Sequence, residues 1–387
     1  MKDIVKTILI SQFPIPYKKT GSWTTMYGYY IQQFNHKIDY IICNKEHGQN
    51  KTVEYQYLKE IGVLDKVKNK LVSGNRYSNY TNAINKIIKP DCKYIIQIID
   101  NKGLVSPLHQ FLSKKHKREN FCVQYFYHGF IFNFTTTNAT PFFKSIDELF
   151  LLTERSRLEC SETYKLTDIV VKVLHNGVNS RLFKTVSSDK KLELRRNNDF
   201  NEELVFLWCS QDRPKKGLEL ALAAFSEVHA KNENTRLLLV GVNKNIEQSG
   251  VKVIGKVPNK NLAIYYQMSD VFLFTTMCKE GFGLVLAEAL KCGCYCIASN
   301  LGGVPEVLNF GRYGVVLNEP YNVKQWVIAM QDAVDVLRIK HENPYIKNIP
   351  KELYNLEDWC NQMNVFIEQS KVCLIKASHK DASVKGC

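Results

Sequence analysis

The sequence lacks the features that mark a metal centre, a disulfide framework or a membrane span. Its 12 cysteines include no Cys-x-x-Cys pair, the spacing that many zinc sites need. Cys292, Cys294 and Cys296 alternate in KCGCYC, where buried, reduced thiols are a simpler interpretation than a metal site. No window approaches the roughly 18 apolar residues of a spanning helix. These absences predict a cytoplasmic protein without a bound metal or cofactor.

Acidic residues are scarce near the N-terminus. Residues 1–143 hold 20 lysines and arginines against 9 acids, whereas residues 144–387 hold 32 against 29, so most of the net charge of +14 lies in the N-terminal part. A basic surface of this kind could meet anionic lipid head groups or nucleic acid. The densest cluster, KKHKR at 114–118, is also typical of a solvated helix end. Charge alone therefore leaves these interpretations open.

The 387 residues are 45% hydrophobic and 23% charged, which is ordinary for a globular chain long enough for two domains. Short apolar runs alternate with helical segments, which predicts parallel sheets covered on both faces. Helices are expected in the first half at 24–34, 79–89 and 104–115, and between the strands of the second half. The expected strands are 5–11, 38–43, 94–100, 121–127, 148–152, 169–174, 204–209, 237–241, 251–257, 271–276, 295–299 and 314–317.

This pattern predicts an α/β protein of two Rossmann-like, doubly wound domains facing a central cleft. We expect one domain over 1–185, a polar linker over 186–200 and a second domain over 201–345. An amphipathic helix over 346–370 is expected to cross back to the first domain, and the polar tail over 371–387 to be disordered. Such domains bind ligands at the carboxyl ends of their strands, so the site is expected there.

The stretch CKEGFGLVLAEALKCGC at 278–294 gives the clearest indication of chemistry. Glu280 precedes a Gly-x-Gly turn at the predicted start of a helix, where free backbone N–H groups favour a phosphate. Glu288 lies about 6 Å further along the helix axis. Carboxylates accept hydrogen bonds from vicinal hydroxyls, so one acid on each side of a diphosphate suits a nucleotide sugar. Acids in loops and on exposed helix faces are also common without any such function.

A second charged segment, SQDRPKKGLELALAAF at 210–225, follows the predicted strand LVFLWC. It places Arg213, Lys215 and Lys216 directly before a helix, at the same edge of the expected sheet. Cations in that place could neutralise a leaving diphosphate without a metal ion. Taken alone, the segment is equally typical of a solvated turn.

Together these segments resemble the large family 4 of retaining glycosyltransferases with the GT-B fold. EGFGLVLAEAL resembles the E-x7-E motif of that family, and ASNLGGVPEVL at 298–308 resembles its GG-x-P-E turn. LHNGVNSRLF, QDRPKKGLELALAAF and GKVPNKNLAIYYQMSDVFLFTT match further segments of the family in the same order. The resemblance is good over residues 170–337 and weak over residues 1–169, the half that is expected to meet variable acceptors.

The resemblance implies roles for individual residues. Glu280 and His128 would lie beside the transferred sugar, while Arg213 and Lys216 would hold the diphosphate. Glu288 would hold the ribose of the donor. The remaining donor contacts that the resemblance implies are Gly21, Val257, Gly281, Phe282, Gly283, Leu284 and Val285.

The implied activity is transfer of a hexose-type sugar from a UDP- or GDP-linked donor to a saccharide or a lipid-linked saccharide, in cell-surface polysaccharide or glycan synthesis. No second carboxylate is clearly placed to form a covalent intermediate, so the resemblance favours retention by front-face attack, without a metal ion. On the acceptor side, Trp23 could stack on a sugar, and Asp100 at the end of YIIQIID could act as a base. The basic first domain could contact anionic membrane peripherally, on its inner face.

Two other classes of protein stay open at this point. A nucleic-acid-binding protein would account for the net charge of +14, but the sequence holds no recognisable base-reading element, so we expect no nucleic-acid partner. A GT-B-like epimerase would use the same nucleotide sugar without any acceptor.

Overall fold

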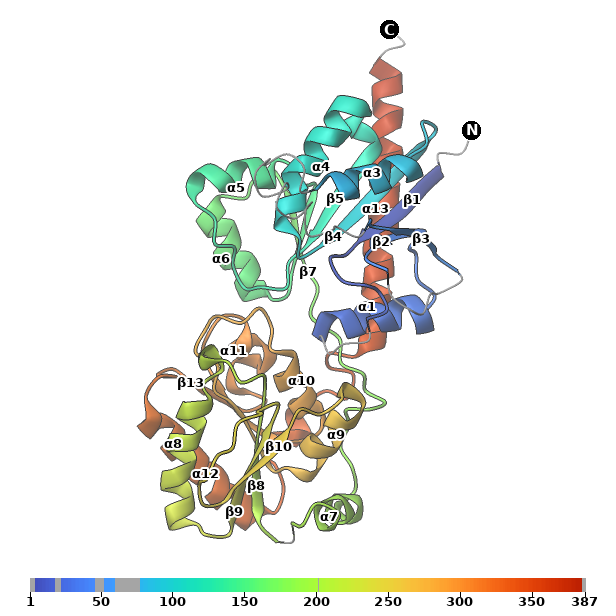
Figure 1. The fold of residues 1–387 in the computed structure, drawn as a ribbon. Coiled ribbons are helices and arrows are strands. Elements are labelled where there is room, and N and C mark those ends of the chain that lie inside the picture. The colour runs from blue at the N-terminus through green and yellow to red at the C-terminus, as the bar shows by residue number, and fades with distance from the viewer. Residues whose placement is uncertain (1–3, 18–21, 46–51, 60–76, 201, 385–387) are drawn as a thin grey trace. The chain divides into compact units, whose positions relative to one another are not determined.

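The protein, seen as a computed structural model, is described over residues 4–17, 22–45, 52–59, 77–200 and 202–384 (Figure 1). The chain divides into two compact units. The first unit comprises Met1–Leu152, Arg157–Leu174 and Glu357–Cys387, and the second comprises Thr153–Ser156 and His175–Leu356. Each unit contains a parallel sheet flanked by helices, which confirms the prediction of two doubly wound α/β domains.

The first unit has, within the described residues, a seven-stranded parallel sheet in the order β3-β2-β1-β4-β5-β6-β7. Its strands are β1 (Ile4–Ile10), β2 (Tyr40–Cys43), β3 (Glu54–Tyr57), β4 (Cys92–Ile99), β5 (Phe121–Phe126), β6 (Glu148–Leu151) and β7 (Val170–Val173). Its helices are α1 (Ser22–Gln33), α3 (Ser78–Ile87), α4 (Lys102–Lys115), α5 (Thr136–Phe143), α6 (Glu154–Tyr164) and α13 (Leu356–Val384), although the first three residues of α6 and the first of α13 belong to the second unit.

The central strands of this sheet are buried on both faces, as their near-continuous apolar runs predict. One face packs with α3, α4 and α5 in a core that includes Ile96, Tyr125 and Leu149. On the other face lie α1 and α13, where Tyr27 and Trp359 pack edge to face at 5.1 Å between ring centroids. Helix α13, red in Figure 1, runs along the elements of the first unit.

The sheet face beneath α13 is polar at its centre. Gln97 Nε2 donates to Gln124 Oε1, and Gln124 Nε2 donates in turn to Glu148 Oε2, each at 2.8 Å. Ser370 of α13 donates to Glu148 at 2.8 Å, and Lys172 forms an ion pair with the same carboxylate at 3.1 Å. Buried polar groups are tolerated when they are paired, so this chain of hydrogen bonds fixes α13 on the first unit.

The second unit has, within the part of the chain that the structure describes, a six-stranded parallel sheet in the order β10-β9-β8-β11-β12-β13. Its strands are β8 (Leu204–Cys209), β9 (Thr235–Val240), β10 (Val251–Gly255), β11 (Val271–Phe274), β12 (Tyr295–Ser299) and β13 (Val315–Leu317). Its helices are α7 (Ser188–Arg196), α8 (Leu218–Lys231), α9 (Asn259–Met268), α10 (Leu284–Lys291), α11 (Val304–Val307) and α12 (Val323–Lys340).

Alternate residues of these strands face opposite layers of helices. Phe206 and Leu239 belong to a core with α8 and α12, while Phe272 packs on Tyr266 of α9, with 5.6 Å between ring centroids. The apolar runs read from the sequence thus serve both faces of the sheet. The three alternating thiols of KCGCYC are buried, and burial raises the pKa of each; they are Cys292, Cys294 and Cys296.

The predicted linker is wrong. Residues 186–200 contain helix α7, and the second unit begins its main segment at His175, well before the predicted residue 201. The Ser187 side chain caps α7 by accepting a hydrogen bond. Arg195 pairs with the carboxylate of Asp270 at 2.5 Å, and its side chain is only 10% exposed. Charged residues that suggest a solvated linker therefore anchor a helix to the second unit.

The C-terminal prediction also needs correction. Helix α13 begins at Leu356, later than the predicted residue 346, and continues to Val384 through most of the tail that was expected to be disordered. Residues 371–384 contain no Gly or Pro that would end a helix. Leu374 is only 8% exposed, so the extension still buries apolar surface on the first unit.

Candidate functional site

The strand order of the second sheet changes direction between β8 and β11. Residues 210–217 follow β8, and residues 275–283 follow β11, so both segments lie at the topological switch point. Ligands of open α/β sheets bind at such points, outside the carboxyl ends of the strands. The fold therefore brings together the two charged, glycine-containing segments that the sequence singled out.

Lys216 and Glu280 meet at this switch point. Lys216 Nζ lies 2.5 Å from Glu280 Oε1, and the two side chains are only 22% and 20% exposed. Thr276 Oγ1 donates to the same oxygen at 3.0 Å, and the Cys278 thiol lies 3.6 Å from it. Within the described residues these contacts all converge on Oε1, so Oε2 is the oxygen of this carboxylate that a ligand hydroxyl can use.

Close backbone approach fixes the position of Lys216. Gly217 has a φ of 70°, and a Cβ at this position would lie 2.0 Å from the carbonyl oxygen of Thr275, so the site requires glycine. Thr275 Oγ1 donates to the Gly217 carbonyl at 2.8 Å and accepts from Trp208 Nε1 at 2.9 Å. The segment after β8 is thereby clamped on the segment after β11.

A third segment, which follows β12, supports the backbone of Glu280. The Gly303 N–H donates to the Glu280 carbonyl at 2.8 Å, and Gly302 forms a parallel bridge with Glu280. A Cβ on Gly302 would lie 2.4 Å from the Glu280 carbonyl oxygen, and one on Gly303 would lie 2.3 Å from that of Gly281. The paired glycines of the GG-x-P-E turn are therefore what allows this contact.

Helix α10 begins directly after the glycine turn. Its N-cap, Gly283, has a φ of 90°, a conformation that favours glycine. The first N–H groups of any helix lack partners within the helix, and here they belong to Leu284 and Val285, which are both half-buried. The turn thus has the backbone geometry that the sequence predicted for a phosphate site.

Phe282, also predicted to contact the donor, has its side chain in the core. It is 2% exposed and packs against His175 and Tyr354, with ring centroids 5.9 and 5.1 Å away. A ligand can therefore contact this residue only through its backbone.

Glu288, in the middle of α10, is half-buried. Burial raises the pKa of its carboxyl to about 8, although the hydrogen bond that Tyr266 Oη donates to Oε2 at 3.3 Å acts in the opposite direction. A carboxyl with this pKa exists in both protonation states near neutral pH. This environment could not be predicted from local patterns, because burial depends on packing with other elements, among them α9, which carries Tyr266.

Two other predicted residues follow strands of the same sheet, β8 and β10. Arg213 is exposed, and its carbonyl accepts the N–H of Lys216 at 2.8 Å. Val257 is half-buried and lies beyond β10, which ends at Gly255 and not at residue 257 as predicted, where the backbone turns through a φ of 84°. In the described part of the chain, no side-chain hydrogen bond or ion pair joins either residue to Glu280.

The first unit has a polar cluster at its own switch point, between β1 and β4. Asp100, directly after β4, has a left-handed φ of 49°. Its Oδ1 accepts the N–H of His128 at 3.0 Å, and its Oδ2 lies 3.6 Å from His128 Nδ1. Burial alone would raise the pKa of Asp100, but the contacts with His128 outweigh burial and lower it. Asp100 and His128, for which we predicted separate roles, are thus neighbours.

Trp23 extends this cluster. Its ring stacks on His128, with 5.4 Å between centroids and 23° between planes, and Phe13 lies 5.7 Å away. Trp23 is half-buried and Phe13 is 42% exposed. The rings therefore present a partly open aromatic surface beside Asp100 and His128. Gly21, predicted to lie near the donor phosphates, is outside the described residues.

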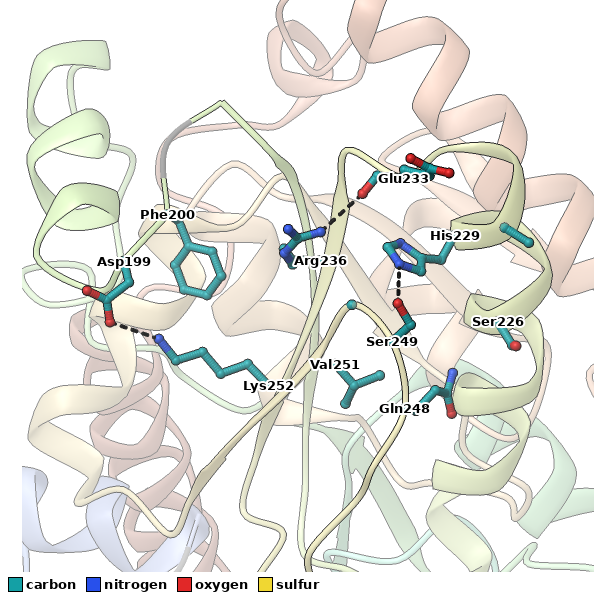
Figure 2. A pocket seen from close by; sticks show the side chains of 12 residues that line it. Asp199, Phe200, Ser226, His229, Glu233, Arg236, Gln248, Ser249, Val251 and Lys252 are labelled. Atoms are coloured by element: carbon teal, nitrogen blue, oxygen red, sulfur yellow. Dashed lines mark hydrogen bonds and ion pairs between the residues drawn. The ribbon is translucent and has the colours of Figure 1, made fainter.

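A cavity of about 810 Å³ occupies a different part of the second unit (Figure 2). It is lined by the end of α8 and the beginnings of β9 and β10. Its two cationic residues have protein partners: Lys252 pairs with Asp199 at 3.3 Å, and Arg236 donates to the backbone carbonyl of Glu233 at 3.1 Å. Because doubly wound folds bind ligands at the opposite, carboxyl ends of their strands, we do not assign the site to this cavity.

Several residues that shape the site follow from no motif. Thr276 and Tyr266 orient the two carboxylates through hydrogen bonds, and they stand at ordinary positions in a loop and a helix. His175 packs against the glycine turn. Glu306 is the acid of the GG-x-P-E turn, and that motif is the sequence signal that points to it.

No helix in the described part of the chain is both long and apolar enough to cross a bilayer. The same residues contain no group of three or more His, Cys, Asp or Glu side chains that could hold a metal ion.

Solved structures define the class to which this fold belongs. Sucrose-phosphate synthase from Thermosynechococcus elongatus matches with a TM-score of 0.72 and 16% identity, over 96% of this chain and 100% of that one. HepE from Anabaena, solved in complex with UDP and glucose, matches with a TM-score of 0.68 and 15% identity, over 94% and 99% of the chains. The fold is that of the GT-B glycosyltransferases.

The sequence comparisons show similarity to one family. Residues 189–351 match the family of glycosyl transferases group 1. The GPI3 subunit of phosphatidylinositol N-acetylglucosaminyltransferase from Saccharomyces cerevisiae is 23% identical over 221 residues, 54% of this chain and 46% of that protein. N-acetyl-alpha-D-glucosaminyl L-malate synthase from Bacillus anthracis is 28% identical over 183 residues, 44% and 46% of the two chains. The matched region spans about half the length of these curated relatives.

Proposed function

We propose that this protein is a group 1 glycosyltransferase. It moves a hexose-type sugar, with retention and without a metal ion or bound cofactor, from a UDP- or GDP-linked donor to a saccharide or a lipid-linked saccharide. The observation that carries the proposal is the Lys216–Glu280 pair at the switch point, next to the glycine turn that opens α10. A nucleotide sugar offers both the diphosphate and the hydroxyl groups that such a pair can bind.

In this proposal Glu280 binds the transferred sugar. Its Oε2 accepts hydrogen bonds from sugar hydroxyls, because Oε1 is engaged by Lys216 and Thr276. The backbone amides that begin α10 bind the diphosphate. Lys216 and the exposed guanidinium of Arg213 add positive charge, which stabilises the phosphate oxygens as the sugar leaves.

The ribose of the donor binds Glu288, which lies in the middle of α10, beyond the glycine turn that opens this helix. Its carboxyl already accepts a hydrogen bond from Tyr266 and has capacity to accept others from the ribose hydroxyls. Val257, in the loop between β10 and α9, would lie toward the base. The names of relatives and of solved structures mention UDP and GDP-mannose, which supports a UDP- or GDP-linked donor.

The cluster of the first unit serves the transferred sugar and the acceptor. His128, held by Asp100, donates or accepts hydrogen bonds beside the sugar, and the stacked rings of Trp23 and His128 offer an apolar face on which a sugar ring can lie. The lowered pKa of Asp100 keeps its carboxylate ionised near neutral pH, so it can accept a hydrogen bond from an acceptor hydroxyl and orient it.

Retention follows from attack on the face that the diphosphate leaves. The bond between the anomeric carbon and the diphosphate oxygen breaks, and the acceptor oxygen forms a bond to the anomeric carbon on that face. The acceptor proton passes to the leaving phosphate oxygen. The protein contributes position and positive charge, through Lys216, Arg213 and the start of α10.

A lipid-linked acceptor agrees with the charge of the first unit. Lys114 and Lys115, at the end of α4, are exposed, and residues 1–143 carry 20 basic against 9 acidic residues. Several relatives have phosphatidylinositol in their names. We infer peripheral contact with the inner face of an anionic membrane, and no nucleic-acid partner.

Thermal melting with UDP, GDP, ADP and CDP tests the proposal. A nucleotide at 100 times its dissociation constant adds about 2.7 kcal/mol of stability. We expect one of the four to stabilise the native protein, and Glu288→Ala to reduce the effect. Glu227→Gln, on the exposed side of α8, is the matched control and should keep it. Stabilisation by none of the four would contradict the assignment of the donor site.

The products separate the proposal from the two alternatives. Release of free nucleotide that depends on an added saccharide or glycolipid supports transfer. Conversion of the donor sugar without any acceptor would indicate an epimerase. Steeply salt-dependent binding of DNA or RNA, without a response to nucleotides, would favour a nucleic-acid-binding protein.

A further inference from the structure

Glu306, in the GG-x-P-E turn, has a carboxylate surrounded by donors. Its Oε1 accepts the N–H of Glu154 at 2.9 Å and Nε2–H of His175 at 2.8 Å, and its Oε2 accepts the N–H of Arg155 at 3.0 Å. The side chain is 12% exposed. Burial alone would raise the pKa of Glu306, but these hydrogen bonds outweigh burial and lower it. The carboxylate is therefore ionised near neutral pH.

The donors come from separate parts of the chain. The amides of Glu154 and Arg155 are the first two of α6, where the dipole of a helix favours negative charge. His175 follows β7. All these residues belong to the second unit, in segments that begin where the chain passes from one unit to the other, at Thr153 and at His175. One carboxylate thus ties both entry segments to the turn.

The same turn supports the loop that carries Glu280. The Gly303 N–H donates to the Glu280 carbonyl at 2.8 Å. A Cβ on Gly303 would lie 2.3 Å from the Gly281 carbonyl oxygen and 2.8 Å from Cγ2 of Thr153. Gly303 is therefore packed between the Glu280 loop and the first entry segment, with no room for a side chain.

A second support of the Glu280 loop also leads to Glu306. Phe282 packs on His175 and on Tyr354, with ring centroids 5.9 and 5.1 Å away. His175 donates to the Glu306 carboxylate, and Tyr354 Oη donates to the Glu306 carbonyl at 3.4 Å. Phe282 of the Glu280 loop thus packs on two side chains, His175 and Tyr354, that both form hydrogen bonds with Glu306.

We propose that Glu306 is a positioning residue of the donor site, which fixes the entry segments at residues 153–156 and 175 and, through them, the loop that presents Glu280 to the donor sugar. The inference rests on the proposed function as far as the sugar is concerned. Its mechanical part, that Glu306 fixes the entry segments and the Glu280 loop, concerns the protein alone and can be measured without any ligand.

Hydrogen exchange tests the mechanical part. Glu306→Gln keeps the size of the side chain but replaces one acceptor oxygen by a donor, so at least one N–H loses its partner. We expect the backbone amides of residues 279–283 to exchange about tenfold faster or more in this variant. Glu203→Gln is the matched control: Glu203 is 15% exposed and pairs with Arg236 at 3.6 Å. Unchanged exchange over 279–283 in Glu306→Gln would overturn the proposal.

Binding of the donor tests the link to Glu280. The probes are the nucleotide that stabilises the native protein and its glucose or mannose conjugate, measured by calorimetry. We expect Glu306→Gln to weaken the conjugate about tenfold and the free nucleotide less than threefold, since Glu280 contacts the sugar. Combined with Glu280→Gln it should cause little further loss, because residues that act as one unit are not additive. Full additivity would overturn the proposal.

Two further outcomes stay informative. If Glu306→Gln does not fold, His175→Gln removes one donor at a side chain that is 41% exposed, and exchange over 279–283 should rise in the same direction; no rise would overturn the proposal. If the native protein binds no nucleotide, the proposed function fails, whereas faster exchange in Glu306→Gln would still support the positioning role.

Discussion

Replacing Glu288 by Gln should make the protein more stable at neutral and alkaline pH. The carboxyl has a pKa of about 8 in the folded protein, against an ordinary value of 4.5, because it is buried beside Tyr266. The folded state therefore binds more protons than the unfolded state between these values, and stability falls as the pH rises from about 4.5 to about 8. Gln has a similar shape and does not titrate, so the variant escapes this loss.

The size of the effect follows from the shift. At about 1.4 kcal/mol per pH unit, the full shift corresponds to about 5 kcal/mol above pH 8 and to about 3 kcal/mol at pH 7. Glu288 is only half-buried, and water screens part of this cost, so we expect about 1.5 kcal/mol at pH 7. For a unit of this size, that is a rise of roughly 3–6 °C in melting temperature.

Melting curves of the native protein and Glu288→Gln at pH 5, 7 and 8.5 measure this effect. The two proteins should melt almost together at pH 5 and diverge as the pH rises, while the exposed control Glu227→Gln should follow the native protein throughout. A difference that is equal at pH 5 and pH 8.5 would refute the reasoning, since it would mean that the Glu288 carboxyl is already ionised in the folded protein.

The same substitution should weaken nucleotide binding, if Glu288 holds the ribose. Ribose hydroxyls donate more strongly to an ionised carboxylate than to a neutral group, so the native affinity for the stabilising nucleotide should rise between pH 6 and pH 8. Glu288→Gln should bind about tenfold more weakly at pH 8 and show a flat profile, as measured by calorimetry. If the nucleotide affinity of the native protein does not rise between pH 6 and pH 8, ionisation of Glu288 does not contribute to binding of the ribose.

Three further substitutions test the rest of the site. Gly217→Ala should lower the melting temperature by several degrees and weaken nucleotide binding, because its Cβ would lie 2.0 Å from a backbone carbonyl oxygen; melting that matches the native protein would contradict the clamp. Lys216→Met should weaken the nucleoside diphosphate about tenfold and the nucleoside little, as measured by calorimetry. Asp100→Asn should reduce transfer to an acceptor while the nucleotide affinity stays within about twofold, which a transfer assay and calorimetry together can check.

The sheets could be predicted from the sequence because their strands are buried on both faces. Runs such as YIIQII and LVFLWC are apolar almost throughout, and they form β4 and β8 within one or two residues of the expected ends. Strand β3 at the edge of the first sheet was missed. Its sequence, Glu54–Tyr57, is EYQY, and none of its residues is fully buried, so it has no apolar run to detect.

Long-range pairing explains the larger errors. Helix α7 is stabilised by the pairing of Arg195 with Asp270, which lies 75 residues further along the chain, so its own residues suggest only a charged linker. Helix α6 begins with two amides bound to Glu306, about 150 residues away. Local patterns carry no information on such partners, nor on the burial that raises the pKa of Glu288.

The Glu280 segments of the second unit and the Asp100 cluster of the first unit are held together by different kinds of contact. This difference explains why family motifs can be found in the sequence of the second unit but hardly in that of the first. In the second unit the segments meet through backbone contacts that leave no room for a Cβ. Positions 217, 302 and 303 therefore require glycine, and these glycines form part of the motifs seen in the sequence. In the first unit the cluster is made by side chains: the ring of Trp23 on His128, and the carboxylate of Asp100 on a backbone amide. Other side chains can build an equivalent surface. Under the proposed function, a site that meets varied acceptors can therefore change its residues without changing its fold, whereas a site for a constant diphosphate keeps its glycines.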